Sequence, residues 1–239
     1  MSNCFALSVT GSSHKRIGLP CQDASYCEKS ADGLIYIAAA DGLGSCKHSD
    51  IGAKLGVKNI IRFLKQGISM PESFEFTKKQ IVGFAKRVKL DPKQMLTTLQ
   101  AAVINPAKKT TVLGIVGDGG VVYTTEDNKH HLFISDFEAE YCNQTQHLLD
   151  NNLRDSVKVS TLNDTVTHLS LFTDGVRSTV VDEENKTPHS PIWIYLLHKS
   201  EQQGLEATIN TLLNNHQIAS ITDDDLTMAS YCLNSSDKR

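Results

Sequence analysis

The sequence predicts an α+β fold in which antiparallel sheets pack against segregated helices. Short apolar runs end at hairpin-type turns, helical periodicity falls in separate blocks, and strict alternation of strand and helix is absent. Hairpins beside segregated helices indicate antiparallel sheets rather than a doubly wound parallel sheet. The chain has 239 residues, which is enough to bury the core of one ordinary domain. We therefore expect a single domain over residues 1–239.

The first strands surround a hairpin turn. Residues 5–9 have strand character, and residues 24–28 and 34–40 flank the turn dipeptide Asp32-Gly33. Residues 34–40 are apolar throughout, as expected of a buried strand. This run ends at residues 41–45, a loop with two glycines.

Two helices are expected next. Ser49 or Asp50 can cap the first, its apolar residues lie near one face, and Gly67 ends it. The second covers about residues 77–88 by its apolar spacing, and Asp91-Pro92 breaks it.

The C-terminal half begins with more strands. Residues 96–104 fit a helix or a strand by period alone, but the turn signal Asn105-Pro106 before the β-branched residues 110–116 favours a hairpin. Residues 135–164 are polar, and we expect an irregular surface excursion there. Further strands are expected at residues 121–123, 131–134, 167–173 and 226–232, and further helices at residues 192–198 and 204–214.

Composition and charge exclude several functional classes. The chain has 24 basic and 27 acidic residues and a formal net charge of −3, without the basic surplus of a nucleic-acid-binding protein. The longest apolar run, residues 34–40, is too short to span a bilayer, and residues 1–10 lack the features of a secretory signal. We expect a cytoplasmic protein with no nucleic-acid or membrane partner. Export without an N-terminal signal stays open, and no oligomeric state is predicted.

The six cysteines do not form a C-x-x-C pair of the kind found in zinc and redox sites. A chain of this length does not need disulfides to be stable. We therefore expect reduced and mostly buried thiols.

Four aspartates lie where predicted strands end or begin. Asp41, Asp118 and Asp174 each come at the end of an apolar strand and precede a glycine, and Asp224 lies just before the last strand. Carboxylates that converge at one site repel one another and raise each other's pKa values unless a cation lies among them. Mg²⁺ and Mn²⁺ prefer such all-oxygen sites. On this evidence alone a set of ordinary turns stays open, because Asp-Gly is a common turn dipeptide.

Motifs around these aspartates follow one another in a fixed order. They are Pro20-Cys21-Gln22-Asp23-Ala24, Ala40-Asp41-Gly42, Gly117-Asp118-Gly119, Thr173-Asp174-Gly175 and Asp224-Asp225-Leu226-Thr227. The ordered set resembles the metal-dependent Ser/Thr phosphatases of the protein phosphatase 2C (PPM) family, and the likeness covers residues 11–229. The first motif, together with Glu140-Tyr141, Asn143 and Thr145, is most similar to a bacterial branch.

The resemblance implies an α-β-β-α sandwich of two antiparallel sheets flanked by helices, with a metal centre at one edge. It implies two Mg²⁺ or Mn²⁺ ions, with a third in some bacterial members. Asp41 would bridge two ions, and the Gly42 carbonyl would bind one of them. Asp174 and Asp224 would complete the first ion, and Asp118 would help to hold the third.

By the same resemblance, the chain would hydrolyse phosphoserine and phosphothreonine in a phosphorylated protein substrate, with a metal-activated water as the nucleophile. Asp23 would hold water on the ions. Asp23, Asp41 and Asp174 are thus the candidate catalytic residues. A metallohydrolase of small phosphate esters differs only in its substrate and stays open.

Two positions depart from the family pattern. Gly18 stands where many members have an arginine that binds the substrate phosphate, and Leu43 where eukaryotic members have a histidine. His14, Lys15 and Arg16 lie just upstream and could bind the phosphate instead, or form a solvated turn. The alternative function is a catalytically weak phosphatase-like module that binds a phosphoprotein or another partner.

Overall fold

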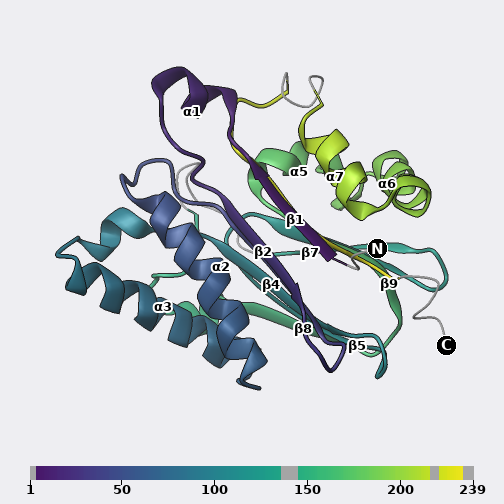
Figure 1. The fold of residues 1–239 in the computed structure, drawn as a ribbon, viewed down its shortest axis with the longest axis horizontal. Helices are drawn as coiled ribbons and strands as arrows, with labels where there is room; N and C mark the ends of the chain where they lie inside the picture. The colour runs from purple at the N-terminus through teal and green to yellow at the C-terminus, as the bar shows by residue number, and fades with distance from the viewer. Residues whose placement is uncertain (1–3, 136–144, 216–220, 234–239) are drawn as a thin grey trace.

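Two five-stranded sheets lie between layers of helices (Figure 1). The computed structural model describes residues 4–135, 145–215 and 221–233. All strand pairings of the two sheets are antiparallel among these residues. The arrangement confirms the predicted α-β-β-α sandwich.

The sheets have the strand orders β1-β12-β9-β6-β7 and β2-β3-β4-β5-β8. The first sheet consists of β1 (Cys4–Val9), β6 (Gly120–Thr125), β7 (His130–Ile134), β9 (Val166–Phe172) and β12 (Leu226–Cys232). The second sheet consists of β2 (Ala24–Lys29), β3 (Ile35–Ala40), β4 (Leu99–Asn105), β5 (Thr110–Val116) and β8 (Lys158–Leu162). The edge strands β1 and β2 lie side by side.

Helices cover the outer faces of both sheets (Figure 1). The second sheet is covered by α2 (Ser49–Lys65) and α3 (Met70–Arg87), and the first by α5 (Asp174–Val180), α6 (Ser190–Gln203) and α7 (Leu205–Leu213). The minor elements are α1 (Ser12–Ile17), α4 (Leu153–Ser156), the 3-10 helix Pro92–Met95, and the strand pair β10 (Val181–Asp182) and β11 (Thr187–Pro188).

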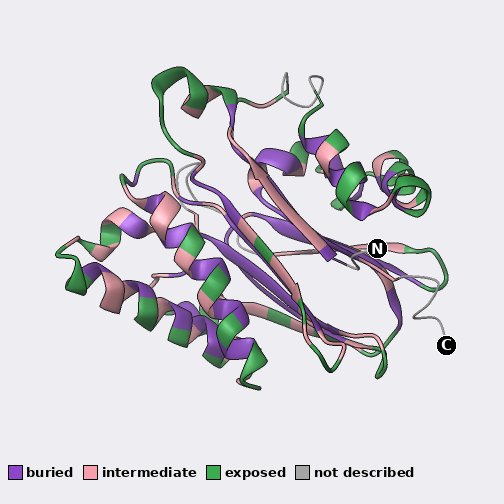
Figure 2. Ribbon diagram, viewed as in Figure 1, coloured by how far each residue is buried: buried purple, intermediate pink, exposed green. Residues whose placement is uncertain are grey.

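The strands inside the sandwich are largely buried, whereas the outer faces of the helices are exposed (Figure 2). β3 lies between β2 and β4 in its sheet, and all of its residues are buried. Its side chains alternate, as in any strand. Ile35 and Ile37 pack with Leu171 between the sheets, whereas Ala38 and Ala40 face the layer of α2. Burial on both faces explains the continuous apolar run in the sequence. It also fixes the end of β3, and with it Asp41.

Helix α3 is longer than predicted. It begins at Met70 rather than near residue 77, with Pro71 in its first turn. Proline is favoured there, because the first amides of a helix have no partner within the helix. Helix α6 likewise begins at Ser190 and extends to Gln203, beyond the predicted residues 192–198.

The predicted irregular excursion at residues 135–164 is wrong in its second half. Residues 153–156 form α4, and residues 158–162 form β8, which pairs with β5. β8 is an edge strand with one face towards solvent, so its sequence lacks a strong apolar pattern. Glu140, Tyr141, Cys142 and Asn143 lie outside the described residues.

Two sequence expectations concern the protein's environment. Among the described residues, the helices lack the combination of length and apolar character that crossing a bilayer requires. The five cysteines in the described part of the chain are not joined by disulfides.

Candidate metal centre

Three carboxylates meet at one edge of the sandwich. One oxygen from each of Asp41, Asp118 and Asp174 lies within 4.8 Å of the other two. Asp41 follows β3, Asp118 lies between β5 and β6, and Asp174 is the first residue of α5, two positions after β9 ends at Phe172. The two sheets thus supply the carboxylates from the ends of rigid strands.

The backbone of Asp41 is held by two threonines of the segment before β4. Its amide donates to Thr98 Oγ1 at 3.0 Å, and its carbonyl accepts from the Thr98 amide and from Thr97 Oγ1, both at 2.8 Å. These bonds use only backbone atoms of Asp41, and its carboxylate is one of the three that meet at the centre. Gly42 pairs with Thr97 in an isolated bridge and is buried. A Cβ there would lie 2.7 Å from the Gln22 carbonyl, so only glycine fits.

Asp118 is held from two sides. Its Oδ2 accepts a hydrogen bond from Thr145 Oγ1 at 3.0 Å, and its carbonyl accepts one from Arg177 Nη1 at 2.6 Å. Arg177 also binds Glu183 through Nε and Nη2, at 2.6 and 3.1 Å. The second carboxylate oxygen, Oδ1, is buried and lacks a hydrogen-bond partner among the described residues.

Asp23 is buried directly behind the cluster. Its Oδ2 accepts a hydrogen bond from Thr173 Oγ1 at 2.8 Å, and its carboxyl group is hydrogen-bonded to that of Asp41. Thr173 comes immediately before Asp174, and its own amide donates to the Thr227 carbonyl at 3.2 Å. Asp23 is therefore hydrogen-bonded both to Asp41 and to the residue that precedes Asp174.

Asp224 lies outside the set of three but is close enough to affect it. Its charge is one of the causes that raise the pKa of Asp174. Gly175 allows this approach, because a Cβ there would lie 2.0 Å from the Asp225 carbonyl oxygen. The structure therefore brings Asp23, Asp41 and Asp174 into direct or hydrogen-bonded proximity and leaves Asp224 at the rim.

Burial and mutual repulsion raise the pKa values of these carboxyl groups. Burial raises the pKa of Asp174 to about 7, with further contributions from Asp118 and Asp224. Burial also raises the pKa of Asp23 to about 7, against hydrogen bonds from Asp41 and Thr173 that lower it. The pKa of Asp41 is raised well above its ordinary value by burial and by the charges of Asp23 and Asp174.

These residues fit a hard divalent cation. They offer oxygen ligands only, they repel one another when ionised, and Asp118 Oδ1 is buried without a partner in the described part of the chain. A divalent cation would remove the repulsion and give that oxygen a partner. His and Cys ligands, which zinc prefers, are absent from the cluster of described residues.

The structure separates the three residues suggested for phosphate binding. The ring Nδ1 of His14 lies 3.0 Å from Asp225 Oδ2, so this part of the ring faces a carboxylate. Lys15 lines a cavity of about 190 Å³ that also contains Asp224, whereas Arg16 is exposed on α1. Of the three, Lys15 is the one that shares a cavity with a residue of the centre.

Sequence reasoning missed the supporting residues of the centre. The sequence predicted no role for three residues that support the centre or the loop beside it. Thr98 holds the backbone of Asp41, Arg177 holds the carbonyl of Asp118, and Asp225 holds the amides of Gly11 and Gln22. Asp225 lies within the closing motif, so its position was visible although its role was not. Arg177 comes three residues after Asp174, and this helical spacing was the one available signal.

Comparison with known proteins agrees with this geometry. The model of the family described as Protein phosphatase 2C matches residues 10–214. Serine/threonine-protein phosphatase 3 of Escherichia coli (strain K12) is 25% identical over 244 residues, which cover 93% of this chain and 94% of that protein.

Solved structures show the same fold. A bacterial serine phosphatase superposes with a TM-score of 0.71 at 17% identity and covers 98% of both chains. The serine/threonine phosphatase Stp1 from Staphylococcus aureus gives a TM-score of 0.68 at 16% identity and covers 98% of this chain and 96% of that one.

Proposed function

The chain belongs to the protein phosphatase 2C family and is a protein serine/threonine phosphatase, and we propose that its carboxylate cluster holds the divalent ions for this reaction. The observation that carries the proposal is the convergence of Asp41, Asp118 and Asp174 within 4.8 Å. The ions are Mg²⁺ or Mn²⁺ because the ligands are all oxygens. Two ions are proposed, with a third on the side of Asp118.

Asp41 lies between Asp23 and Asp174 and would contact both main ions, together with the Gly42 carbonyl. Asp174 and Asp224 would complete the coordination of the first ion. Divalent ions, when bound, supply Lewis acidity that activates the attacking water and offsets the charge on the phosphate. The protein supplies fixed geometry, because these carboxylates start from strand ends and their backbones are hydrogen-bonded.

The protein groups at the centre act by holding and orienting. Asp23 accepts a hydrogen bond from Thr173 Oγ1, and its carboxyl group is hydrogen-bonded to that of Asp41, so its orientation is fixed beside the centre. This arrangement suits a residue that orients water. We propose no side-chain nucleophile, so the phosphoryl group passes directly from the serine or threonine oxygen to water.

The weak-module alternative has one observation in its favour. Arg177 approaches the centre, but its guanidinium is bound to the Asp118 carbonyl and to Glu183. It is therefore not available to bind substrate phosphate, and Gly18 offers no side chain. The retained carboxylates favour the enzyme, since a module without turnover has no need of a repulsive cluster.

The test is hydrolysis of p-nitrophenyl phosphate and a phosphothreonine peptide with Mn²⁺, Mg²⁺ or EDTA. The variant is Asp174→Asn, and Asp155→Asn is the matched control because Asp155 is an exposed surface residue. We expect metal-dependent turnover that Asp174→Asn abolishes and Asp155→Asn retains. Metal-independent turnover, or turnover unchanged in Asp174→Asn, would refute the proposed centre. Failure to bind Mn²⁺ at millimolar concentration, together with no turnover of either substrate, would favour the weak module, whereas Mn²⁺ binding without turnover would point to an unusually selective enzyme.

A further inference from the structure

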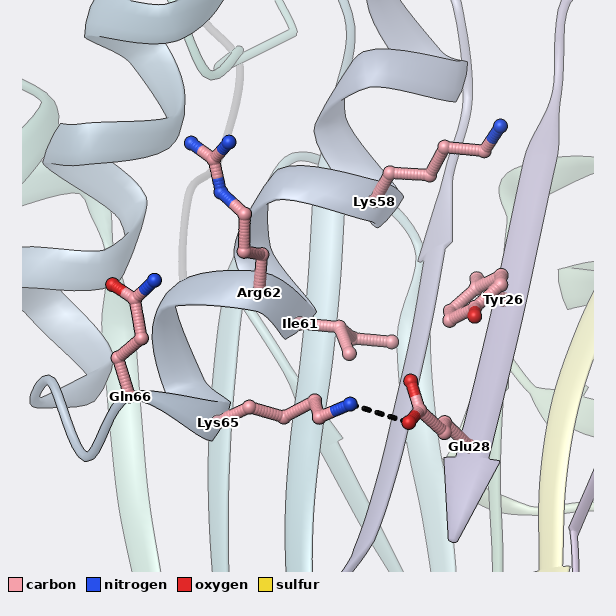
Figure 3. Close-up of a pocket in the computed structure, with 7 residues that line it drawn as sticks. All are labelled: Tyr26, Glu28, Lys58, Ile61, Arg62, Lys65 and Gln66. Carbon is pink, nitrogen blue, oxygen red and sulfur yellow. Dashed lines mark hydrogen bonds and ion pairs between the residues drawn. The ribbon is translucent and has the colours of Figure 1, made fainter. Parts of the chain in front are cut away.

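A basic groove runs along the outer edge of the sandwich, between helix α2 and edge strand β2 (Figure 3). Its volume is about 570 Å³. Ile61 and Tyr26 form its apolar part, and Figure 3 shows Lys65 bound to Glu28 beside them. The Arg62 guanidinium points away from Tyr26 and lies over the Phe63 ring at 4.6 Å. We call this the α2–β2 groove, and it is lined by Tyr26, Glu28, Lys58, Ile61, Arg62 and Lys65.

Cations form a row along this side of α2. Lys54, Lys58, Arg62 and Lys65 recur at helical spacing, and all four are exposed. Lys54 is paired with Asp50 at 2.9 Å, and Lys65 is paired with Glu28 across the groove. Lys58 and Arg62 have no ion-pair partner among the residues that the structure describes. The groove therefore carries a local positive surplus in a chain whose formal net charge is −3.

The groove continues towards the metal centre. A second cavity of about 400 Å³ shares Tyr26 and Lys58 with it and is also lined by Lys54 and Asp23. Asp23 is hydrogen-bonded to Asp41, so this end of the cavity reaches the residues behind the carboxylate cluster. α2 begins at Ser49 near the Asp41 loop and runs away from the centre, and its cations follow the same path.

We propose that the α2–β2 groove binds an acidic segment of the phosphoprotein substrate, on one side of the phosphorylated residue. This inference rests on the proposed function and adds a substrate class to it. Lys54 and Lys65 are 11 residue steps apart on the helix, which is about 16.5 Å at 1.5 Å per residue. An extended peptide covers about 3.3 Å per residue, so the row accommodates about five residues.

The surface favours an acidic peptide over other polyanions. Tyr26 is one partly exposed aromatic ring, whereas single-stranded nucleic acid needs a series of rings on which bases stack. Glu28 would repel a continuous phosphate backbone but leaves room for separate carboxylates at Lys58 and Arg62. A membrane surface would need exposed apolar side chains beside the cations, and Ile61 is buried at 2% exposure.

The experiment compares two phosphothreonine peptides with the same central sequence. One peptide has Asp and Glu at the positions that lie four to eight residues from the phosphothreonine, and the other has Ser and Gln at the same positions. Each pair of peptides is tested with these positions on the N-terminal side and on the C-terminal side. The protein variants are Lys58→Gln with Arg62→Gln, and the control double variant Lys86→Gln with Lys108→Gln. Both pairs remove two exposed positive charges, and neither residue of the control pair lines the groove or the second cavity.

We expect wild type and the control variant to prefer the acidic peptide in kcat/KM at low salt. Lys58→Gln with Arg62→Gln should lose about threefold to tenfold on that peptide, as expected for two screened charge pairs. Its turnover of the neutral peptide and of p-nitrophenyl phosphate should be unchanged.

Three outcomes would overturn the inference. These are equal kcat/KM values for the two peptides, equal losses in the groove and control variants, and groove-dependent binding of an RNA oligonucleotide or anionic vesicles without a peptide preference. The absence of p-nitrophenyl phosphate turnover in wild type would instead count against the proposed function. In that case, fluorescence anisotropy of the labelled acidic peptide still tests the groove.

Discussion

The Asp225 carboxylate joins the closing strand to Gln22, whose amide donates to Asp225 Oδ2 at 2.6 Å. The other oxygen accepts from the Gly11 amide at 2.7 Å. Gly11 and Gln22 are the two ends of the loop that contains α1, and the His14 ring lies 3.0 Å from the same carboxylate. Asp225 thus fixes this loop beside Asp23 and Asp224.

The first prediction concerns this clamp. Burial alone would raise the pKa of Asp225, but the Gly11 and Gln22 amides and His14 outweigh burial and lower it. Asp225→Ala leaves two buried amides without an acceptor, so we expect a loss of about 3 kcal/mol in the free energy of unfolding. Asp225→Asn keeps one acceptor oxygen and should lose about half as much. Urea unfolding at neutral pH measures both, and equal stability of wild type and Asp225→Ala would contradict the clamp.

The second prediction is a trade-off at Asp174. The folded-state pKa of Asp174, about 7, lies above its ordinary 3.8. This group therefore contributes stability that is present below pH 3.8 and is lost as pH rises through 7. Asparagine does not ionise, so Asp174→Asn should raise the melting temperature in EDTA at pH 8 by about 3 °C. This gain should shrink towards pH 5.

Added Mn²⁺ should reverse the order of the two melting temperatures, so that wild type becomes more stable than Asp174→Asn. Under the proposed function, wild type would gain stability from a bound ion, whereas Asp174→Asn would lack one of the proposed ligands. Thermal unfolding at pH 8 with EDTA and with millimolar Mn²⁺ checks both parts. A variant that is less stable than wild type in EDTA at pH 8 would show that the carboxylates do not repel one another there.

The third prediction concerns Thr145, which holds Asp118 through Oδ2 at 3.0 Å. Thr145→Val removes this donor and keeps the shape of the side chain. Groups that orient a metal ligand typically contribute about tenfold or more in metal affinity, so we expect Mn²⁺ to bind at least about tenfold more weakly. Thr145→Ser retains the hydroxyl and should bind Mn²⁺ as wild type does. Isothermal titration with Mn²⁺ separates the two, and equal affinities would assign Thr145 no part in holding Asp118.

The sequence predicts the positions of the carboxylates better than their support. Asp41, Asp118 and Asp174 could be found because each stands at the end of an apolar strand, and strand ends of one sandwich share an edge. The clamp by Asp225 could not be found, because its partners Gln22 and Gly11 are 203 and 214 residues away in the chain. Such pairs depend on tertiary packing, which local patterns do not encode.

The missed strand β8 has a different cause. Its burial alternates between half-buried and exposed residues, and only one neighbour, β5, pairs with it. A strand at an edge needs few apolar residues, so its sequence resembles a loop. Central strands such as β3 are buried on both faces and were visible from composition alone.

The last prediction concerns His168, which is fully buried on β9 with its ring edge-on to Trp193 at 6.2 Å. Burial lowers the pKa of His168 from 6.5 to about 4, and the charge of His130 contributes. The neutral ring therefore supplies stability that is present above pH 6.5 and is lost as pH falls towards 4. Between pH 7.5 and pH 5 this loss amounts to about 2 kcal/mol.

His168→Leu cannot take up a proton, so its stability should fall by about 2 kcal/mol less than that of wild type over this range. Urea unfolding of wild type and His168→Leu at the two pH values measures the difference between the two falls in stability. The site carboxylates have the opposite pH dependence, but they are present in both proteins, so their effect cancels in this difference. Equal falls would mean that His168 is not the residue that makes the fold sensitive to acid.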